Sequence, residues 1–224
     1  HNFPNLALMR ISAYHKAIGD DVEWWLGDLF HYDIVYMVKV FSEAYSKDVH
    51  EPINADKVVK GGTGYCITLD GGKEVFHKEL NKDLPPEIEA MPPDYSIYPE
   101  YDFAVAMTSR GCPRGCPFCV VGKKEGLRSV KVADVSAFYK GKKHIEVLDP
   151  NITACPDKHE LFEQYIETGA TVTFNQGLDI RLLTNADIAI LNRMRLQGIH
   201  FAWDNPKCNL EKKFKYYVLL YYMM

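Results

Sequence analysis

The chain has 224 residues, of which 47% are hydrophobic and 25% are charged, and its formal net charge is −4. It is long enough to bury a sizeable core in one large domain or two small ones. An acidic balance offers no electrostatic basis for nonspecific nucleic-acid binding, and no apolar run approaches the roughly 18 residues that a membrane span needs.

The first 83 residues alternate helical and strand patterns. The predicted elements are a helix at 5–18, strands at 22–25, 33–38 and 57–60, and a glycine-rich loop at 61–65. The helix has apolar side chains at helical spacing and ends at Gly19. The segment 33–38 is nearly all apolar, as a parallel strand buried on both faces should be. This alternation predicts a small Rossmann-like α/β layer over residues 1–83.

A proline-rich segment follows at residues 84–100, where five of the residues are proline. Proline lacks a backbone N–H and restricts its own backbone, so a segment of this kind is extended and cannot join the interior of a sheet. We therefore predict an interdomain linker over residues 84–100.

Residues 101–224 return to alternating strands and helices with longer spacing. The predicted strands are 103–107, 144–148, 171–174 and 199–203, the predicted helices are 132–140, 158–168 and 185–197, and a last buried strand is predicted at 216–224. Strand–helix units in series, with strands that end on polar residues, predict a β/α barrel or a partial barrel. Sites in such folds lie at the carboxyl ends of the strands.

Three cysteines lie within eight residues, directly after the strand predicted at 103–107. Cys112, Cys116 and Cys119 have the spacing C-x3-C-x2-C. Three thiolates on one loop can hold three irons of a cubane cluster and leave the fourth iron open to a ligand. Zinc sites usually show two pairs of ligands, a disulfide framework suits a small secreted chain, and a ferredoxin places its fourth cysteine close by. A zinc site and structural thiols stay open as alternatives.

The motif C-x3-C-x-aromatic-C, completed by Phe118, resembles that of the radical S-adenosylmethionine (SAM) superfamily. The resemblance implies a 4Fe–4S cluster on Cys112, Cys116 and Cys119, whose open iron binds SAM, with Phe118 at the cofactor site. It implies reductive cleavage of SAM to methionine and a 5′-deoxyadenosyl radical, with the cofactor carrying the difficult chemistry. It also implies a partial barrel of radical SAM type and a reducing partner such as flavodoxin or ferredoxin.

Polar side chains follow two of the predicted barrel strands. Asp149 and Asn151 follow the strand at 144–148, where the superfamily often binds the ammonium group of SAM. The alternative is a plain turn, because the sequence Asp-Pro-Asn favours turns. The residues after the strand at 171–174 could contact the ribose and carboxylate of SAM, or form a solvated loop with a local ion pair. These are Asn175, Gln176, Asp179 and Arg181.

Further resemblance, over most of the chain, is to radical SAM proteins that carry an N-terminal cobalamin-binding-like domain. The residues that carry it are Pro4–Met9, Gly61–Tyr65 and Pro93–Tyr95. We do not expect cobalamin, because the segment around His15 departs from that group's lower-ligand pattern, Asp-x-His-x-x-Gly. We expect His15 to be a histidine on the helix surface.

Both ends of the chain look truncated, since the first strand of the Rossmann-like layer and the last barrel strands are missing. Free cysteines, an oxygen-sensitive cluster and the lack of a recognisable signal peptide together predict the cytoplasm. The resulting hypothesis is a cytoplasmic radical SAM enzyme that acts on an unknown substrate. The alternative is a non-catalytic scaffold that binds an Fe–S cluster or zinc.

Overall fold

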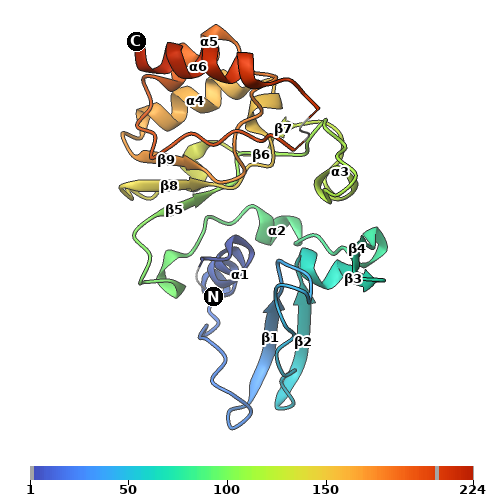
Figure 1. The fold of residues 1–224 in the computed structure, drawn as a ribbon. Coiled ribbons are helices and arrows are strands. Elements are labelled where there is room, and N and C mark those ends of the chain that lie inside the picture. Colours follow the sequence, from blue (N-terminus) through green and yellow to red (C-terminus); the bar gives the residue numbers. More distant parts are fainter. Residues whose placement is uncertain (1–2, 205–206, 224) are drawn as a thin grey trace. The chain divides into compact units, whose positions relative to one another are not determined.

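The computed structural model describes residues 3–204 and 207–223 (Figure 1). The chain divides into two compact units, His1–Pro99 and Glu100–Met224, and the division falls within the proline-rich segment 84–100. The fold is mixed α/β with small parallel sheets, and the described residues form no closed barrel. Within this same part of the chain, no helix is both long and apolar enough to cross a lipid bilayer.

The first unit contains a parallel strand pair and an antiparallel hairpin, each beside short helical segments. Its elements are α1 (Leu6–Ile18), β1 (Tyr32–Val38), β2 (Ala55–Gly61), β3 (Ile67–Asp70), β4 (Lys73–Phe76) and α2 (Pro86–Glu89), with 3-10 turns at Thr63–Cys66, Lys78–Leu80 and Tyr95–Ile97.

Helix α1 is confirmed, and both of its ends follow from local chemistry. The side chain of Asn5 accepts a hydrogen bond from the backbone N–H of Leu8 at 3.1 Å, which satisfies one of the unpaired donors of the first turn. Gly19 ends the helix with a φ of +96°, a left-handed conformation that glycine adopts without steric cost.

The strands β1 and β2 are confirmed, and they pair in parallel with Val35 opposite Val58. The expectation that β1 is buried on both faces is wrong, because Val35 and Met37 are buried whereas Ile34 is 37% exposed. Within the described residues β1 pairs only with β2, so the two strands form a two-stranded sheet. The strand expected at Val22–Trp25 is also wrong, since this segment has no regular structure.

The glycine-rich loop at 61–65 packs tightly against the chain that follows β1. Gly62 has a φ of +96°, and a Cβ at this residue would collide with the carbonyl oxygen of Lys39. A Cβ at Gly64 would collide with the carbonyl oxygen of Phe41. The glycines therefore allow a close backbone approach within the unit.

The proline-rich segment packs on α1 within the first unit. Ile88 in α2 is buried, and Arg10 of α1 forms an ion pair with Glu89. Asp94 accepts hydrogen bonds from Ser12 Oγ and Lys16 Nζ, both at 2.7 Å. The segment is therefore held to α1 by apolar and ionic contacts.

The second unit is built around a small parallel sheet. Its elements are β5 (Ala104–Ala106), β6 (Ser109–Arg110), α3 (Val121–Lys124), β7 (Val130–Lys131), β8 (His144–Val147), α4 (Lys158–Glu167), β9 (Thr171–Phe174), α5 (Asn185–Leu191) and α6 (Glu211–Met223), with 3-10 turns at Val135–Ala137 and Ile152–Ala154.

Strands β5, β8 and β9 are parallel and lie in the order of the sequence (Figure 1). Helix α4 covers one face of this sheet, where the rings of Phe162 and Tyr165 lie 5.9 and 6.1 Å from the ring of Phe174. Because the three strands run in one direction, their carboxyl ends share one edge, and the loops that follow them meet there.

Several expected elements of this unit differ in the structure. The helix expected at 132–140 is wrong, since only Val135–Ala137 forms a helical turn, and valines and Ser136 favour helix weakly. The helix expected at 185–197 ends at Leu191. The strand expected at 199–203 is reduced to one parallel bridge, which joins Phe201 to Leu178.

The strand expected at 216–224 is wrong, because Glu211–Met223 form the helix α6; Met224 lies outside the described residues. Its aromatic residues favour strands in isolation, but tertiary packing decides the outcome. Tyr217 is buried and donates a hydrogen bond to the carbonyl oxygen of Leu183 at 2.6 Å. The rings of Phe214 and Phe201 lie 5.8 Å apart.

Candidate functional site

The cysteine loop leaves the carboxyl edge of the parallel sheet and is closed at its base. Strands β6 and β7 pair in an antiparallel ladder on either side of the loop. Inside this ladder, the backbone N–H of Cys112 donates to the carbonyl oxygen of Gly126 at 3.2 Å, and that of Gly111 donates to Glu125 Oε2 at 3.1 Å. The loop is therefore a bounded segment whose two ends are tied together.

Gly111 at the start of the loop is required by the backbone. Its φ is +83°, and a Cβ at this position would collide with the carbonyl oxygen of Arg128. A side chain would separate the two ends of the loop, so the glycine directly before Cys112 has a structural reason.

The three loop cysteines are free thiols, and each is partly exposed. Cys66 and Cys155 are buried, and burial raises the pKa of the Cys155 thiol. Among the described residues, no group of three or more His, Cys, Asp and Glu side chains is placed to share a metal ion. In this conformation the loop thus presents accessible thiols that have not converged on a common centre.

A chain of hydrogen bonds links the cysteine loop to the ends of two strands. Asn151, which is buried, directs its Nδ2 at the sulfur of Cys112 at 3.4 Å. The hydroxyl of Thr153 donates to Asn151 Oδ1 at 2.6 Å and accepts from the backbone N–H of Asp179 at 3.1 Å. Asn151 and Asp179 are therefore brought together as the sequence predicts, through a threonine that the sequence analysis did not select.

Asp179, which is buried, and Arg181, which is half-buried, form an ion pair beside the loop. Arg181 donates from Nε to Asp179 Oδ1 at 2.5 Å, and this hydrogen bond raises the pKa of the guanidinium. Arg114 of the cysteine loop places its Nε 3.7 Å from Asp179 Oδ2, which is an ion-pair distance. Asp179 Oδ2 and Arg181 Nη1 are buried without a hydrogen-bond partner among the described residues. The two residues are ion-paired, but Asp179 Oδ2 can accept and Arg181 Nη1 can donate one further hydrogen bond, which suits a ligand that carries both charges.

Asp149 has its oxygens engaged within the fold. Its carboxylate accepts hydrogen bonds from the backbone N–H and the hydroxyl of both Thr108 and Ser109, at 2.6 to 2.8 Å. Burial raises the pKa of Asp149, and these hydrogen bonds act in the opposite direction. The carboxylate thus fastens the end of β8 to Thr108 and to Ser109, the first residue of β6. Its role as an acceptor for the SAM ammonium stays a prediction.

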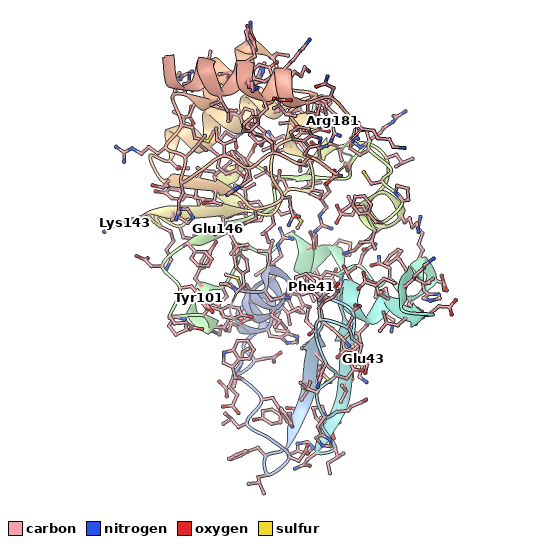
Figure 2. The ribbon with its side chains drawn as sticks, in the orientation of Figure 1. Phe41, Glu43, Tyr101, Lys143, Glu146 and Arg181 are labelled. Carbon is pink, nitrogen blue, oxygen red and sulfur yellow. The ribbon has the colours of Figure 1, made fainter. Side chains whose placement is uncertain are left out.

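The remaining predicted residues lie apart from this cluster or are exposed. Phe118 is 72% exposed, and Gln176 is exposed. Asn175 donates from Nδ2 to Glu146 Oε2 at 2.6 Å, on the strand β8. Figure 2 labels Glu146 and Arg181, which lie in different parts of the second unit. Sequence reasoning missed Glu146 and its neighbour His144, although the alternation His-Ile-Glu-Val already indicates a strand with one polar face.

His15 in the first unit has both ring nitrogens engaged. Nδ1 lies 2.6 Å from Asp20 Oδ2, and Nε2 lies 2.8 Å from the hydroxyl of Tyr36. The sequence predicts a histidine on the surface of the helix, and in the structure the ring is half-buried by these contacts. Neither nitrogen is open to a further ligand in this arrangement.

The chain was compared with protein-family models, with curated proteins and with solved structures, and none of them matches it. Its chemistry must therefore be inferred from the residues and their geometry.

Proposed function

We propose that this chain is a radical SAM protein in which Cys112, Cys116 and Cys119 hold a 4Fe–4S cluster. The observation that carries the proposal is three free, partly exposed thiols in the spacing C-x3-C-x2-C, on a loop at the carboxyl edge of a parallel sheet. When bound, the cluster supplies the electron that cleaves SAM to methionine and a 5′-deoxyadenosyl radical.

The donor set fits such a cluster in its chemistry. Thiolates are the usual ligands of iron–sulfur clusters, and three of them leave one iron for SAM. The thiols are not gathered around one point in the described conformation, so binding a cluster requires the loop to rearrange. The ladder of β6 and β7 ties the base of the loop together, and Gly115 near the tip has a φ of +55°, in the left-handed region that favours glycine.

The pair of Asp179 and Arg181 supports a place for the amino-acid part of SAM. Arg181 Nη1 can donate to a carboxylate, and Asp179 Oδ2 can accept from an ammonium group. Hydrogen bonds through Asn151 and Thr153 link Asp179 to Cys112. Asn151 and Thr153 would therefore position the ligand relative to the cysteine loop.

We also propose that β5, β8 and β9 are the first strands of a partial β/α barrel of radical SAM type. Their parallel order follows the sequence, as a β/α series requires. Single parallel bridges at Leu196 and Phe201 continue this direction beyond β9. A reducing partner such as flavodoxin or ferredoxin would then supply electrons, and the basic side chains of Arg114, Lys123 and Lys124 near the cysteines suit an acidic partner.

The test is anaerobic reconstitution with iron and sulfide, followed by dithionite and SAM. About four irons per chain and the release of 5′-deoxyadenosine are expected. Replacement of any one of Cys112, Cys116 and Cys119 by serine should abolish both, whereas Cys208→Ser serves as a matched control with a partly exposed thiol outside the motif. Bound iron without SAM cleavage would favour the non-catalytic Fe–S scaffold. Stoichiometric zinc with no uptake of iron would favour the zinc scaffold.

A further inference from the structure

The face of the parallel sheet opposite α4 is polar where it would ordinarily be apolar. Along β8 and β9, Ile145, Val147, Val172 and Phe174 are buried toward the helices, and the alternating positions carry His144, Glu146, Thr171 and Thr173. Parallel sheets are normally buried on both faces and read as continuous apolar runs. A half-polar parallel sheet therefore requires an explanation beyond packing.

The polar side chains on this face are joined to one another. Glu146 Oε1 lies 2.9 Å from His144 Nε2, and Glu146 Oε2 accepts from Asn175 Nδ2 at 2.6 Å. Thr173 Oγ1 lies 3.2 Å from the same histidine nitrogen. The side chains of Glu146 and His144 are each only 17% exposed. The network thus holds one mostly buried carboxylate in a fixed orientation.

Glu146 forms an ion pair with His144, which is charged only when protonated, and His200 lines the same pocket. Lys143 is exposed and directly precedes His144, so its side chain lies on the opposite face of the sheet from His144 and Glu146. Figure 2 shows Lys143 at the outer edge of the sheet. A carboxylate whose counter-ion is a histidine rather than a permanent cation, and which lines an open pocket, suits the binding of a cationic group.

An open pocket of about 270 Å³ lies on this face. Its lining residues are Glu146, Thr173, Asn175, Gln197, Gly198 and His200. The volume is near the lower end of the roughly 300–1,000 Å³ that ligand pockets occupy, so it suits a small molecule or the end group of a larger one.

The Glu146 end of the pocket offers acceptors. An ionised Glu146 accepts only, so His144 Nε2 must be the donor in their hydrogen bond, and the carboxylate keeps unused lone pairs. Asn175 donates to Glu146 through Nδ2, and this leaves its Oδ1 as a further acceptor. A primary ammonium group has three N–H donors and a positive charge, which matches this set.

We propose that the pocket beside Glu146 is a binding site for the ammonium group of a small primary amine. The site goes beyond the cluster chemistry proposed above, because the side-chain hydrogen bonds of Glu146 and Asn175 are made within the sheet face and none of them goes to the cysteine loop. If the chain is a radical SAM protein, this amine is its substrate class.

The test uses the full chain without iron and follows backbone amide signals of Thr173, Asn175 and Gly198 by NMR. The probes are 1,4-diaminobutane, its uncharged analogue 1,4-butanediol and the dianion succinate. We expect saturable shifts with the diamine and none with the diol or succinate. Glu146→Gln keeps the shape of the side chain and should weaken diamine binding about tenfold or more, as the loss of a charged hydrogen-bond partner does. Glu167→Gln, an exposed position on α4, should leave binding unchanged.

Equal shifts with diamine and diol, shifts with succinate alone, or no shift with any probe would each overturn the proposal. The preference of the unmodified chain for diamine over diol tests it even if Glu146→Gln fails to fold. Because the measurement needs no cluster, a failure of amine binding is distinct from a failure of iron binding or SAM cleavage. Retained diamine affinity in a folded Glu146→Gln protein would also refute the role of this carboxylate.

Discussion

The side-chain nitrogen Nδ2 of Asn151 lies 3.4 Å from the sulfur of Cys112. The two residues are 39 positions apart in the chain, and they belong to the loop between β6 and β7 and to the loop after β8. The contact exists because parallel pairing brings the carboxyl ends of β5 and β8 to the same edge. It gives a cysteine of the proposed cluster a hydrogen-bond donor from the neighbouring strand.

We predict that Asn151→Ala lowers the reduction potential of the reconstituted cluster. Hydrogen bonds to cluster sulfurs stabilise the reduced, more negative state, so losing one makes reduction harder. Potentiometric titration followed by EPR measures the change. Asn185→Ala, on α5 and hydrogen-bonded to Tyr216, is the control and should leave the potential unchanged. An unshifted potential in Asn151→Ala would contradict a role for this hydrogen bond.

We predict that Asp149→Asn destabilises the second unit. The amide nitrogen of asparagine cannot accept, so hydrogen bonds from Thr108 or Ser109 are lost in a buried place. The cost is about 1–3 kcal/mol for each donor left without a partner. Urea denaturation measures the free energy of unfolding, and Asp102→Asn, which is 81% exposed, is the control. Equal stability of the two variants would show that Asp149 does not hold the sheet edge together.

We predict that Arg181→Ala weakens the binding of SAM by about tenfold to a hundredfold while the iron content stays the same. The guanidinium contacts Asp179 and leaves Nη1 buried and unpaired, so it is the group available to a ligand carboxylate. Arg181→Lys should restore little affinity, because lysine cannot reproduce the planar donor geometry. Equilibrium dialysis with labelled SAM is the measurement. Arg193→Ala, which removes an exposed ion pair with Glu163, should bind SAM normally.

We predict that alkylation separates the cysteines of the free protein into two classes. Cys112, Cys116 and Cys119 are partly exposed, whereas Cys155 is buried and its thiol pKa is raised by that burial. Because the thiolate is the reactive form, Cys155 should react more slowly with iodoacetamide at pH 8 in the folded chain. Peptide mass spectrometry reads out each site. In urea the difference should vanish, and rapid labelling of Cys155 without urea would be inconsistent with its burial.

We predict that Asp94→Asn destabilises the first unit at pH 7 by about 1–3 kcal/mol. Burial alone would raise the pKa of Asp94, but hydrogen bonds from Lys16, Ser96 and Ser12 hold this pKa well below its usual value. A carboxyl whose pKa is lowered in the folded state stabilises the fold above its unfolded pKa, about 3.9, and loses this contribution as the pH falls further.

The difference between Asp94→Asn and the unmodified chain should therefore be largest at neutral pH and should shrink below about pH 4. Urea denaturation at pH 7 and at pH 3 tests this. Asp21→Asn, at an exposed position just after α1, provides the comparison and should have no effect at either pH. A difference that grows on acidification would mean that Asp94 is not the charged partner of Lys16.

Some features follow from the sequence because their causes are local. Helix α1 begins after Asn5 and ends at Gly19. Asparagine is a common residue before the first turn of a helix and glycine is common after the last, so the sequence alone indicates both ends. The strand Thr171–Phe174 agrees residue for residue with its alternating pattern. The spacing of Cys112, Cys116 and Cys119 is likewise visible in the chain without any fold.

Other features depend on what each segment packs against. The residues 216–223 have the composition of a strand, and they form a helix because Tyr217 and Phe214 find partners on distant segments. Asp149 looked like a ligand for an amine, and the fold surrounds it with four donors from Thr108 and Ser109.

The sequence by itself determined the local elements and the chemical types of the candidate residues, since backbone preferences and side-chain spacing act over a few positions. Only the tertiary structure decided which of those residues meet. Parallel pairing of β5, β8 and β9 brings Asn151 and Asp179 to the cysteine loop and sends Asn175 to Glu146 instead. Contacts between strands that are tens of residues apart depend on the pairing register and on the face of the sheet that each side chain occupies, and no local sequence pattern contains this information.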